Sequence, residues 1–519
     1  MRKVTTTVAA ALVAFSFAAC NKTNNVTPEE GANSYASVRV NVKNSLKAIN
    51  DGEQKDNKGT EAESKVSSMA LVGAGATWAD ADITGPTNDG IYKGAAKPVT
   101  VTGPQILGLV LNSTDLTTST EATAEFGTSD AVADLKKVSS DNSFVMTSKV
   151  MSQNIKPNIA KGDAETKNML DFGKVERVVA KGIVQKADGF SEKSENGTVS
   201  MEGVTYAAVN GATKTYVYAN QAGDRKMGVA DPNQYAGFKS LIDGIAPEAD
   251  DAKAMEAGMI RRGQLGADLG GYAAKEVKDP AVTDYTDANP GVKEGVYFLE
   301  NSGEANAANK KDGFYRFAYA KIYATFVPTT VYDIDEAATE FVAKADTGKK
   351  YKKDGDGKWV ESTDADAQEG QLVYKLKEVK YTKGTTFYMG EKDGRFYLTK
   401  NAAAQSTIEG ALGQKSFTYT KGRAGYRALW NRQSPDGNVK LVNNASTRRN
   451  NIYVLNIKKF QKIGMPWDPS DPNDPDLPKP EDPEEPNYPD NPNIEDQDSY
   501  VAVQCEMVPW NVVGRTIEL

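Results

Sequence analysis

The chain has 519 residues, with 62 Lys and Arg against 70 Asp and Glu, and its formal net charge of −8 favours solubility without attracting nucleic acid or anionic membranes. Histidine is absent, which removes the usual general base, the Ser–His and Cys–His nucleophilic pairs and the commonest metal ligand. Hydrolase and metalloenzyme functions therefore lose most of their support, and we expect a protein without catalytic, cofactor-binding or metal-binding residues.

The first 19 residues have the pattern of a signal peptide. Arg2 and Lys3 precede an apolar run over residues 8–19, and Cys20 follows directly, ahead of a polar segment. This arrangement is typical of a bacterial lipoprotein precursor in which Cys20 carries the lipid; a plain signal peptide with an incidental cysteine is the alternative. No later apolar stretch approaches the roughly 18 to 20 residues that a membrane-spanning helix needs. We therefore expect an exported protein that contacts the membrane only through the precursor's lipid.

An amphipathic strand is predicted shortly after Cys20. Ala36, Val38, Val40 and Val42 alternate with polar residues, which is the period-2 pattern of a strand with one buried face. The polar segment 50–64 that follows indicates an exposed, protease-accessible loop.

The length of the chain suggests two or three domains, of which we favour two. Short apolar segments separated by Gly, Asn and Asp predict a first β-sandwich over residues 48–218 and a second, richer in aromatic residues, over 219–467. The fold class is therefore all-β with minor helices, for which weak patterns occur at 130–137 and 160–170. The segments that carry the β prediction are 106–111, 144–147, 175–184, 204–218, 314–327, 370–379, 386–389, 395–398, 417–419 and 452–457.

Two Asp–Gly clusters in the second half predict turns. Asp393-Gly394 lies between two predicted strands and is a hairpin signal. The cluster at 354–357 alternates Asp and Gly like part of a calcium loop, but it lacks the terminal Glu and the flanking helices of such a site. A hairpin turn is therefore favoured there as well.

Near the C-terminus, a proline-rich tether separates a last strand from the rest of the chain. Prolines recur every two or three residues through 468–495, which prevents helix and sheet pairing alike. As an extended polyproline helix this tether would span at most roughly 87 Å. An ordinary flexible linker is the alternative reading.

The segment 496–519 beyond the tether contains a second alternating strand. Val501, Val503, Cys505 and Met507 occupy its apolar phase. Cys505 is the only cysteine besides Cys20, so the mature chain has no intramolecular disulfide, and its register indicates a buried strand residue more than a reactive thiol. Because strand addition to another subunit's sheet is a known mode of assembly, a tethered strand favours a polymer subunit over an enzyme.

Several motifs resemble the Mfa-type minor fimbrillins of Porphyromonas gingivalis, within the FimA/Mfa-like fimbrillins of the Bacteroidales. The resemblance is specific over residues 370–519 and looser in the first half. The matching motifs lie at 34–35, 175–181, 387–391, 419–422, 449–453, 464–469, 496–498 and 508–510.

The resemblance implies a lipoprotein precursor with two transthyretin-like β-sandwich domains, a lipidated propeptide at 20–47 and a donor strand at 496–519. A gingipain-type surface protease would cut between Lys47 and Ala48, where the family has an Arg, or alternatively at Arg39. The cut removes a first strand bearing Val38, Val40 and Val42. A donor strand from a neighbouring subunit then fills the groove with Val501, Val503, Cys505 and Met507, supported by Val508 and Trp510.

The function implied is that of a shaft subunit of a minor-type cell-surface fimbria, which forms a homopolymer, joins accessory anchor and tip subunits, and supports adhesion to a host or bacterial receptor. A lipid-anchored accessory or anchor subunit is one alternative. Another is a surface carbohydrate-binding lipoprotein that uses exposed aromatic residues such as Trp78, Trp359 or Trp430.

Overall fold

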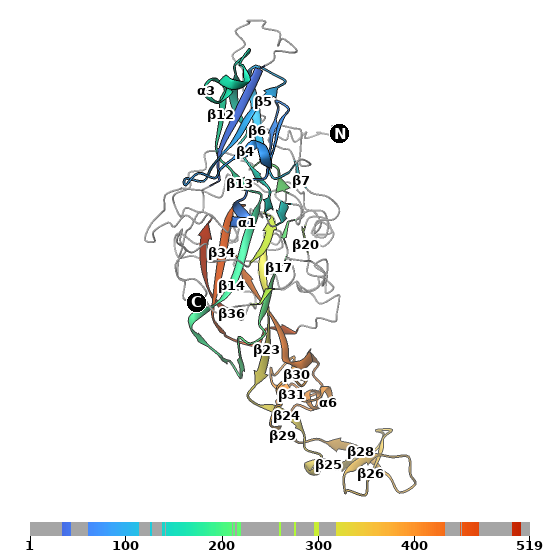
Figure 1. The fold of residues 1–519 in the computed structure, drawn as a ribbon. Coiled ribbons are helices and arrows are strands. Elements are labelled where there is room, and N and C mark those ends of the chain that lie inside the picture. Colours follow the sequence, from blue (N-terminus) through green and yellow to red (C-terminus); the bar gives the residue numbers. More distant parts are fainter. Residues whose placement is uncertain are drawn as a thin grey trace, which may run out of the picture.

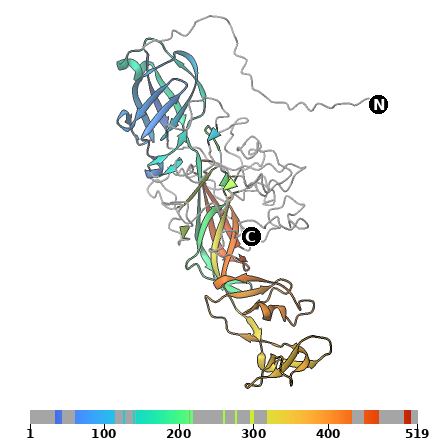
Figure 2. The ribbon, with the colours of Figure 1, turned by 90° about the vertical axis from the view of Figure 1, so that its right-hand side faces the viewer.

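Strands dominate the structure, which confirms the all-β prediction, and the few helices are short. The computed structural model describes residues 34–42, 61–113, 125–126, 138–140, 142–209, 211–212, 215–218, 259–260, 275–276, 295–299, 318–430, 447, 449–466 and 501–509. Figures 1 and 2 show an elongated molecule with two packed groups of sheets and a narrow extension at one end. No helix in this described part is long and apolar enough to cross a membrane. The helices are α1 (Glu61–Ser64), α3 (Ala164–Lys167), α6 (Lys400–Ala404), and the 3-10 turns η1 (Asp80–Asp82), η2 (Lys161–Asp163), η6 (Glu336–Ala338) and η7 (Thr420–Gly422).

The first unit consists of two sheets around one core that runs from Ala36 to Val175. One sheet has the order β12-β1-β5-β4, and the other has the order β13-β10-β6-β2-β3 with β11 also paired to β6. A small hairpin, β8–β9, lies beside them. The strands are β1 (Ser34–Asn41), β2 (Ser68–Val72), β3 (Ala76–Ala79), β4 (Ile83–Thr84), β5 (Ile91–Val99), β6 (Gly103–Leu111), β8 (Ser139–Ser140), β9 (Ser143–Phe144), β10 (Met146–Thr147), β11 (Met151–Ile155), β12 (Met169–Lys174) and β13 (Glu176–Arg177).

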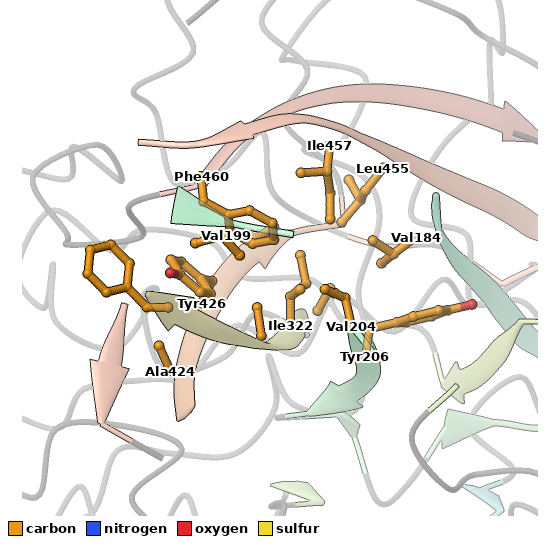
Figure 3. Close-up of a cluster of buried hydrophobic side chains, with 14 of the residues drawn as sticks. Val184, Val199, Val204, Tyr206, Ile322, Ala424, Tyr426, Leu455, Ile457 and Phe460 are labelled. Atoms are coloured by element: carbon orange, nitrogen blue, oxygen red, sulfur yellow. The ribbon is translucent and has the colours of Figure 1, made fainter. Parts of the chain in front are cut away.

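The second unit also has two sheets, whose facing side chains form the larger core shown in Figure 3. One has the order β20-β18-β22-β14-β34-β36, and the other β15-β16-β23-β17-β21 with β33 paired to β23 and β35. The pair β7–β19 links the two units. The strands are β7 (Glu125–Phe126), β14 (Val179–Ser191), β15 (Lys193–Ser194), β16 (Gly197–Val199), β17 (Thr205–Val209), β18 (Gly211–Ala212), β19 (Thr215–Tyr216), β20 (Met259–Ile260), β21 (Lys275–Glu276), β22 (Val296–Leu299), β23 (Tyr319–Pro328), β33 (Arg423–Leu429), β34 (Asn451–Phe460), β35 (Met465–Pro466) and β36 (Val501–Pro509).

The strand β34 is an interior strand of its sheet, and residues on both of its faces are buried. It runs parallel to β14 on one side and antiparallel to β36 on the other. Tyr453, Leu455 and Ile457 point into the second core, while Ile452 and Val454 are also buried. A strand covered on both faces reads as a continuous apolar run rather than as an alternation, which is the pattern of 452–457.

The narrow extension is an insertion between two strands of the second unit. β23 and β33 pair directly as antiparallel neighbours, and residues 329–422 between them form the distal segment. Its five-stranded sheet, β29-β24-β31-β30-β32, adds Val331, Phe387 and Phe396 to the second core, and a four-stranded tip sheet, β25-β28-β26-β27, lies at the end of the molecule (Figure 1). The strands are β24 (Val331–Ile334), β25 (Glu340–Ala343), β26 (Lys350–Lys353), β27 (Trp359–Glu361), β28 (Gln368–Val373), β29 (Leu376–Val379), β30 (Phe387–Gly390), β31 (Phe396–Tyr397) and β32 (Ser416–Tyr419).

The cores place the division between the units earlier than the sequence boundary at residue 218. Val175 packs in the first core, whereas Ala180 already packs in the second, together with Val199 and Tyr206. The segment 179–209, assigned above to the first sandwich, therefore belongs to the second. Its alternating pattern is the same whichever sheet receives it, so the pattern alone did not identify its partner.

Both predicted turns are hairpins. The 354–357 cluster connects the antiparallel strands β26 and β27, and the Asp354 carboxylate accepts hydrogen bonds from the backbone N–H groups of Asp356 and Lys358. Asp393-Gly394 likewise lies between the antiparallel strands β30 and β31. The helical pattern at 160–170 forms η2 and α3, and the one at 130–137 lies outside the described residues.

Candidate functional site

The predicted first strand is β1, and it lies inside a sheet. It runs parallel to β12, with Val38 opposite Leu170, and antiparallel to β5, with Val38 opposite Gly94. Ala36, Val38 and Val40 are fully buried and Val42 is 4% exposed. The alternation in the sequence thus matches the buried face, and taking β1 away would leave a groove between two strands that do not pair with each other.

Buried polar groups fix the start of β1. Asn168 donates a hydrogen bond from its side-chain nitrogen to the Tyr35 carbonyl, and its oxygen accepts from the N–H of Lys156. The Ser34 hydroxyl donates to the Lys156 carbonyl. These contacts come from residues more than a hundred positions away, so only the folded first unit holds β1 in this register.

One position in the floor of the sheet requires a glycine for reasons of space. A β-carbon added to Gly94 would lie 2.8 Å from the Val38 side chain and 2.8 Å from Trp78 Nε1. Trp78 is buried and donates its indole N–H to the carbonyl of Ala95, which holds the ring in place. Gly94 and Trp78 therefore shape the place where the side chain of residue 38 sits.

The predicted terminal strand is β36, and it lies at an edge. It pairs antiparallel with β34, with Val503 opposite Ile457, Cys505 opposite Leu455 and Met507 opposite Tyr453. Those three β34 residues belong to the second core. The apolar phase predicted for the terminal segment thus coincides in register with the core face of β34.

The structure does not bring the two strands together. β1 lies in the first unit and β36 in the second, beside β34 and β14 (Figure 1). Val508 is the last of the predicted donor residues in the described part, opposite Ile452. Cys20, Lys47, Ala48, Trp510 and the tether 468–495 lie outside the described residues.

Arg39, the alternative processing residue, lies in the middle of β1. Its backbone pairs with Asp171 in β12 and with Lys93 in β5, and its exposed guanidinium lies 3.6 Å from the Asp171 carboxylate. A protease needs an accessible, extended backbone, whereas this one is paired on both sides.

A buried charged cluster at the junction of the two units was not predicted. The Lys181 ammonium in β14 lies 2.5 Å from the Glu63 carboxylate in α1, and the Tyr297 hydroxyl donates to the same oxygen. Arg177 donates from Nε to the Glu63 carbonyl and from a terminal nitrogen to the Asn450 side chain. Burial lowers the pKa of Arg177 to about 10. Nothing in the sequence around Glu63 distinguishes it from a surface helix residue.

Two of the three tryptophans considered for carbohydrate binding are core residues. Trp78 is 1% exposed and Trp430 is fully buried, stacked on Phe298. Trp359 is half-buried in the tip sheet and stacks on Phe341 with ring centroids 4.6 Å apart. The exposed aromatic surface that this alternative needs is therefore absent at Trp78 and Trp430.

Comparisons with known proteins show which proteins the chain resembles. Residues 417–515 match the family model for "Major fimbrial subunit protein type IV, Fimbrillin, C-terminal". The chain is also 23% identical over 381 residues to the "Minor fimbrium subunit Mfa1" of Porphyromonas gingivalis, across 70% of this chain and 62% of that protein's length. The chain is thus similar to fimbrillins of the Mfa and FimA type, most specifically over its C-terminal part. Both matches are fimbrial subunits, which agrees with the expectation of a structural protein.

Solved structures show weaker likenesses. A fimbrillin from Porphyromonas gingivalis is 14% identical, covers 93% of this chain and 99% of its own, and has a TM-score of 0.41. A putative cell adhesion protein from Parabacteroides distasonis is 11% identical, covers 92% and 100%, and has a TM-score of 0.35. The tip fimbrial protein Mfa3 from Porphyromonas gingivalis is 11% identical, covers 82% and 95%, and has a TM-score of 0.24.

Proposed function

We propose that this chain is a shaft subunit of a cell-surface fimbria and that subunits join by protease-triggered strand exchange. The precursor is exported with a lipid on Cys20. Cleavage after Lys47 releases the segment that contains β1, and the strand at 496–519 of a neighbouring copy enters the open groove. The observation that carries the proposal is that an apolar strand in the interior of one sheet and a tethered terminal strand share the same spacing of apolar residues.

The groove gives the exchange its driving force. β1 buries four apolar side chains, at Ala36, Val38, Val40 and Val42. The three valines alone contribute about 1.5 to 3 kcal/mol each on burial, and backbone hydrogen bonds to β12 and β5 add to this. A cleaved subunit therefore exposes apolar surface and unpaired strand edges until another strand covers them.

The donor is available because β36 pairs with a single strand in the described part of the chain. It pairs with β34 on one side, and its other side is the edge of the sheet in the described part. To reach a neighbouring subunit, β36 must leave β34. The tether at 468–495 then supplies the reach.

Cleavage at Lys47 suits this mechanism better than cleavage at Arg39. A cut after Lys47 removes the whole of β1, whereas a cut after Arg39 divides it and leaves Val40 and Val42 in place. The pairing of Arg39 on both sides also protects its backbone. The protease would be a gingipain-type surface enzyme that accepts lysine.

The partners follow from the same mechanism. Identical subunits form the shaft, and accessory anchor and tip subunits of the same fimbria occupy its ends. The fibre would support adhesion to a host or bacterial surface receptor. The location is the outer membrane for the lipidated precursor and the cell-surface fimbrium for the mature subunit.

The test is N-terminal sequencing with intact-mass measurement of the subunit in fibres sheared from the native cell. A start at Ala48 in SDS-resistant oligomers supports cleavage and strand exchange. A lipidated Cys20 start without oligomers contradicts the shaft role and favours the lipid-anchored accessory subunit. Glycan binding by such a monomer would instead support the carbohydrate-binding adhesin.

A further inference from the structure

We propose that the groove left by β1 selects one register of the incoming strand, with Val503 in the place of Val38 and Ala502 in the place of Ser37. This inference rests on the proposed strand exchange, and it identifies the groove residues that determine the register of the donor strand. Two neighbouring positions of the groove, the Gly94–Trp78 floor and the closed site of Ser37, carry it.

The Ser37 position is closed to solvent. The Ser37 side chain is fully buried, and its hydroxyl has no hydrogen-bond partner in the described structure. A buried hydroxyl without a partner costs stability, so an apolar residue of similar size is a better occupant. A larger or charged side chain would not fit there without moving the strand.

The neighbouring polar position of β1 has the opposite character. The Arg39 side chain is 46% exposed and lies over the Asp171 carboxylate. Large and polar side chains are therefore tolerated at position 39, whereas the fully buried position 37 discriminates among the residues of a donor strand.

The residue that each register puts at position 37 decides among the alternatives. With Val503 in the place of Val38 and the strand running as β1 does, Ala502 takes the Ser37 site. A shift of two residues puts Tyr500 or Gln504 there, and the reversed strand puts Gln504 or Glu506 there. Only one of these registers places a small apolar residue in the closed site.

The size of the outer apolar positions agrees with this direction. Ala36 is fully buried, and Val42 is 4% exposed at the other end of the strand. In the proposed register Val501 replaces Ala36 and Met507 replaces Val42. The reversed register with Glu506 at position 37 would put Met507 in the place of Ala36, and such overpacking strains a closed core.

The Gly94–Trp78 floor contacts the residue that replaces Val38 and limits its size. Among the β1 residues on the buried face, Val38 has a glycine as its partner on β5, whereas Ala36 pairs with Lys97 and Val40 with Tyr92. A β-carbon at Gly94 would touch Val38 and Trp78 together. A change at Gly94 therefore interacts with the size of the donor residue at this place and not with the residues two positions away.

The first test measures the displacement of β1 by synthetic peptides of residues 496–519. The acceptor is the full chain with a site-specific protease sequence at Lys47 and with Val503→Asp in its own donor strand, so that it does not polymerise. Ala502→Leu in the peptide should weaken binding about tenfold or more, and the matched Gln504→Leu should leave it within about twofold. Equal effects of the two changes, or a larger effect of Gln504→Leu, would overturn the register.

The second test uses the chain itself. Ser37→Ala in the precursor should slow displacement of β1 by the natural peptide about fivefold or more. The change removes a buried hydroxyl without a partner and so makes β1 bind more tightly in its own sheet. Gly94→Ala in the chain should weaken binding of the natural peptide, and this loss should be about tenfold larger than the loss for the Val503→Ala peptide. The control is Gly162→Ala, where an added β-carbon meets nothing, and it should leave the binding of both peptides unchanged.

The β-carbon added at Gly94 also meets Trp78, but this clash is the same whichever peptide is bound, so its effect on binding cancels when the two peptides are compared. Coupling of Gly94 to position 501 or 505 instead of 503 would overturn the assignment. A natural peptide that does not bind the cleaved chain at all would instead overturn the strand exchange, so the two failures are distinguishable.

Discussion

The Lys181 ammonium lies 2.5 Å from the Glu63 carboxylate, and the two side chains are 0% and 2% exposed. Glu63 belongs to α1, beside the first unit, and Lys181 to β14 of the second. Taking both charges out of water is costly, and their mutual attraction and the hydrogen bond from Tyr297 help to compensate for it. The pair thus joins the two units in one arrangement. Because α1 begins after Ala48, the mature subunit would keep this junction.

Glu63→Gln should destabilise the protein strongly. Lys181 would remain buried beside a neutral amide in place of the Glu63 carboxylate, and breaking a buried pair in this way costs about 3 to 5 kcal/mol. Urea unfolding followed by circular dichroism measures the change. The matched control is Glu361→Gln, which removes the partner of Lys349 in a pair whose side chains are both 58% exposed. Its effect should be at most about 1 kcal/mol, and equal effects would show that the junction is open to water.

Val503→Asp should give a folded monomer that forms no fibre. The position lies in the edge strand β36 of the second unit, so the first unit and its strand β1 are unaffected. The groove of a neighbouring subunit, however, cannot accept a buried carboxylate without a partner. Electron microscopy and SDS-resistant ladders measure assembly, and circular dichroism measures folding. Gln504→Asp is the control, and it should polymerise normally. Normal fibres from Val503→Asp would refute the role of this residue.

Tyr218→Phe should make the protein less sensitive to alkali. Burial raises the pKa of Tyr218 to about 12, against about 10 for an ordinary tyrosine. Between these values the folded state keeps a proton that the unfolded state releases, so the free energy of unfolding falls as the pH rises. The slope from one such group is about 1.4 kcal/mol per pH unit. Phe at this position removes that contribution.

The comparison requires urea unfolding at pH 9, 10 and 11. Phe172→Leu, a core change in the first unit that leaves every titrating group in place, should lower stability while keeping the slope of the wild type. An unchanged slope in Tyr218→Phe would mean that its hydroxyl reaches water.

The tip sheet should be dispensable for folding and assembly. Glu340 and Val373 pair directly across β25 and β28, so residues 341–372 can be replaced by a short turn. The aromatic contacts of Phe341 with Tyr351 and Trp359 lie within the tip itself. The truncated chain should keep its melting temperature and form fibres.

Val331→Ala provides the contrast, because Val331 is fully buried in the second core although it lies in the same distal segment. It should cost about 2 kcal/mol. A large loss of stability in the truncated chain would show that the tip supports the body of the protein.

Alternation in the sequence predicted the strands better than their partners. The pattern at 36–42 identifies the buried face of β1, and the Asp393-Gly394 turn identifies a hairpin, because both depend on residues close together in the chain. β1 pairs in parallel with β12, more than a hundred residues away, and no short sequence pattern near either strand indicates this pairing. The same holds for β14 and β34, whose pairing moves residues 179–209 into the second unit.

The candidate site divides in the same way. The apolar residues of β1 and β36 could be found because each lies in a short strand with one apolar phase. Gly94 and Glu63 could not, since their roles come from what the fold places beside them: Trp78 and Val38 in one case, Lys181 and Arg177 in the other. A glycine in a strand and an acidic residue in a short helix are otherwise unremarkable in the sequence.

The interior position of β1 has a consequence for how such fibres would end. A subunit that has lost β1 lacks the middle of a sheet, so its folding is complete only when a strand from another copy is in place. Folding and association then share one free energy, and dilution would not return stable single subunits. Growth would depend on the supply of newly cleaved chains, and the exposed groove of the last subunit would remain a receptor for the next.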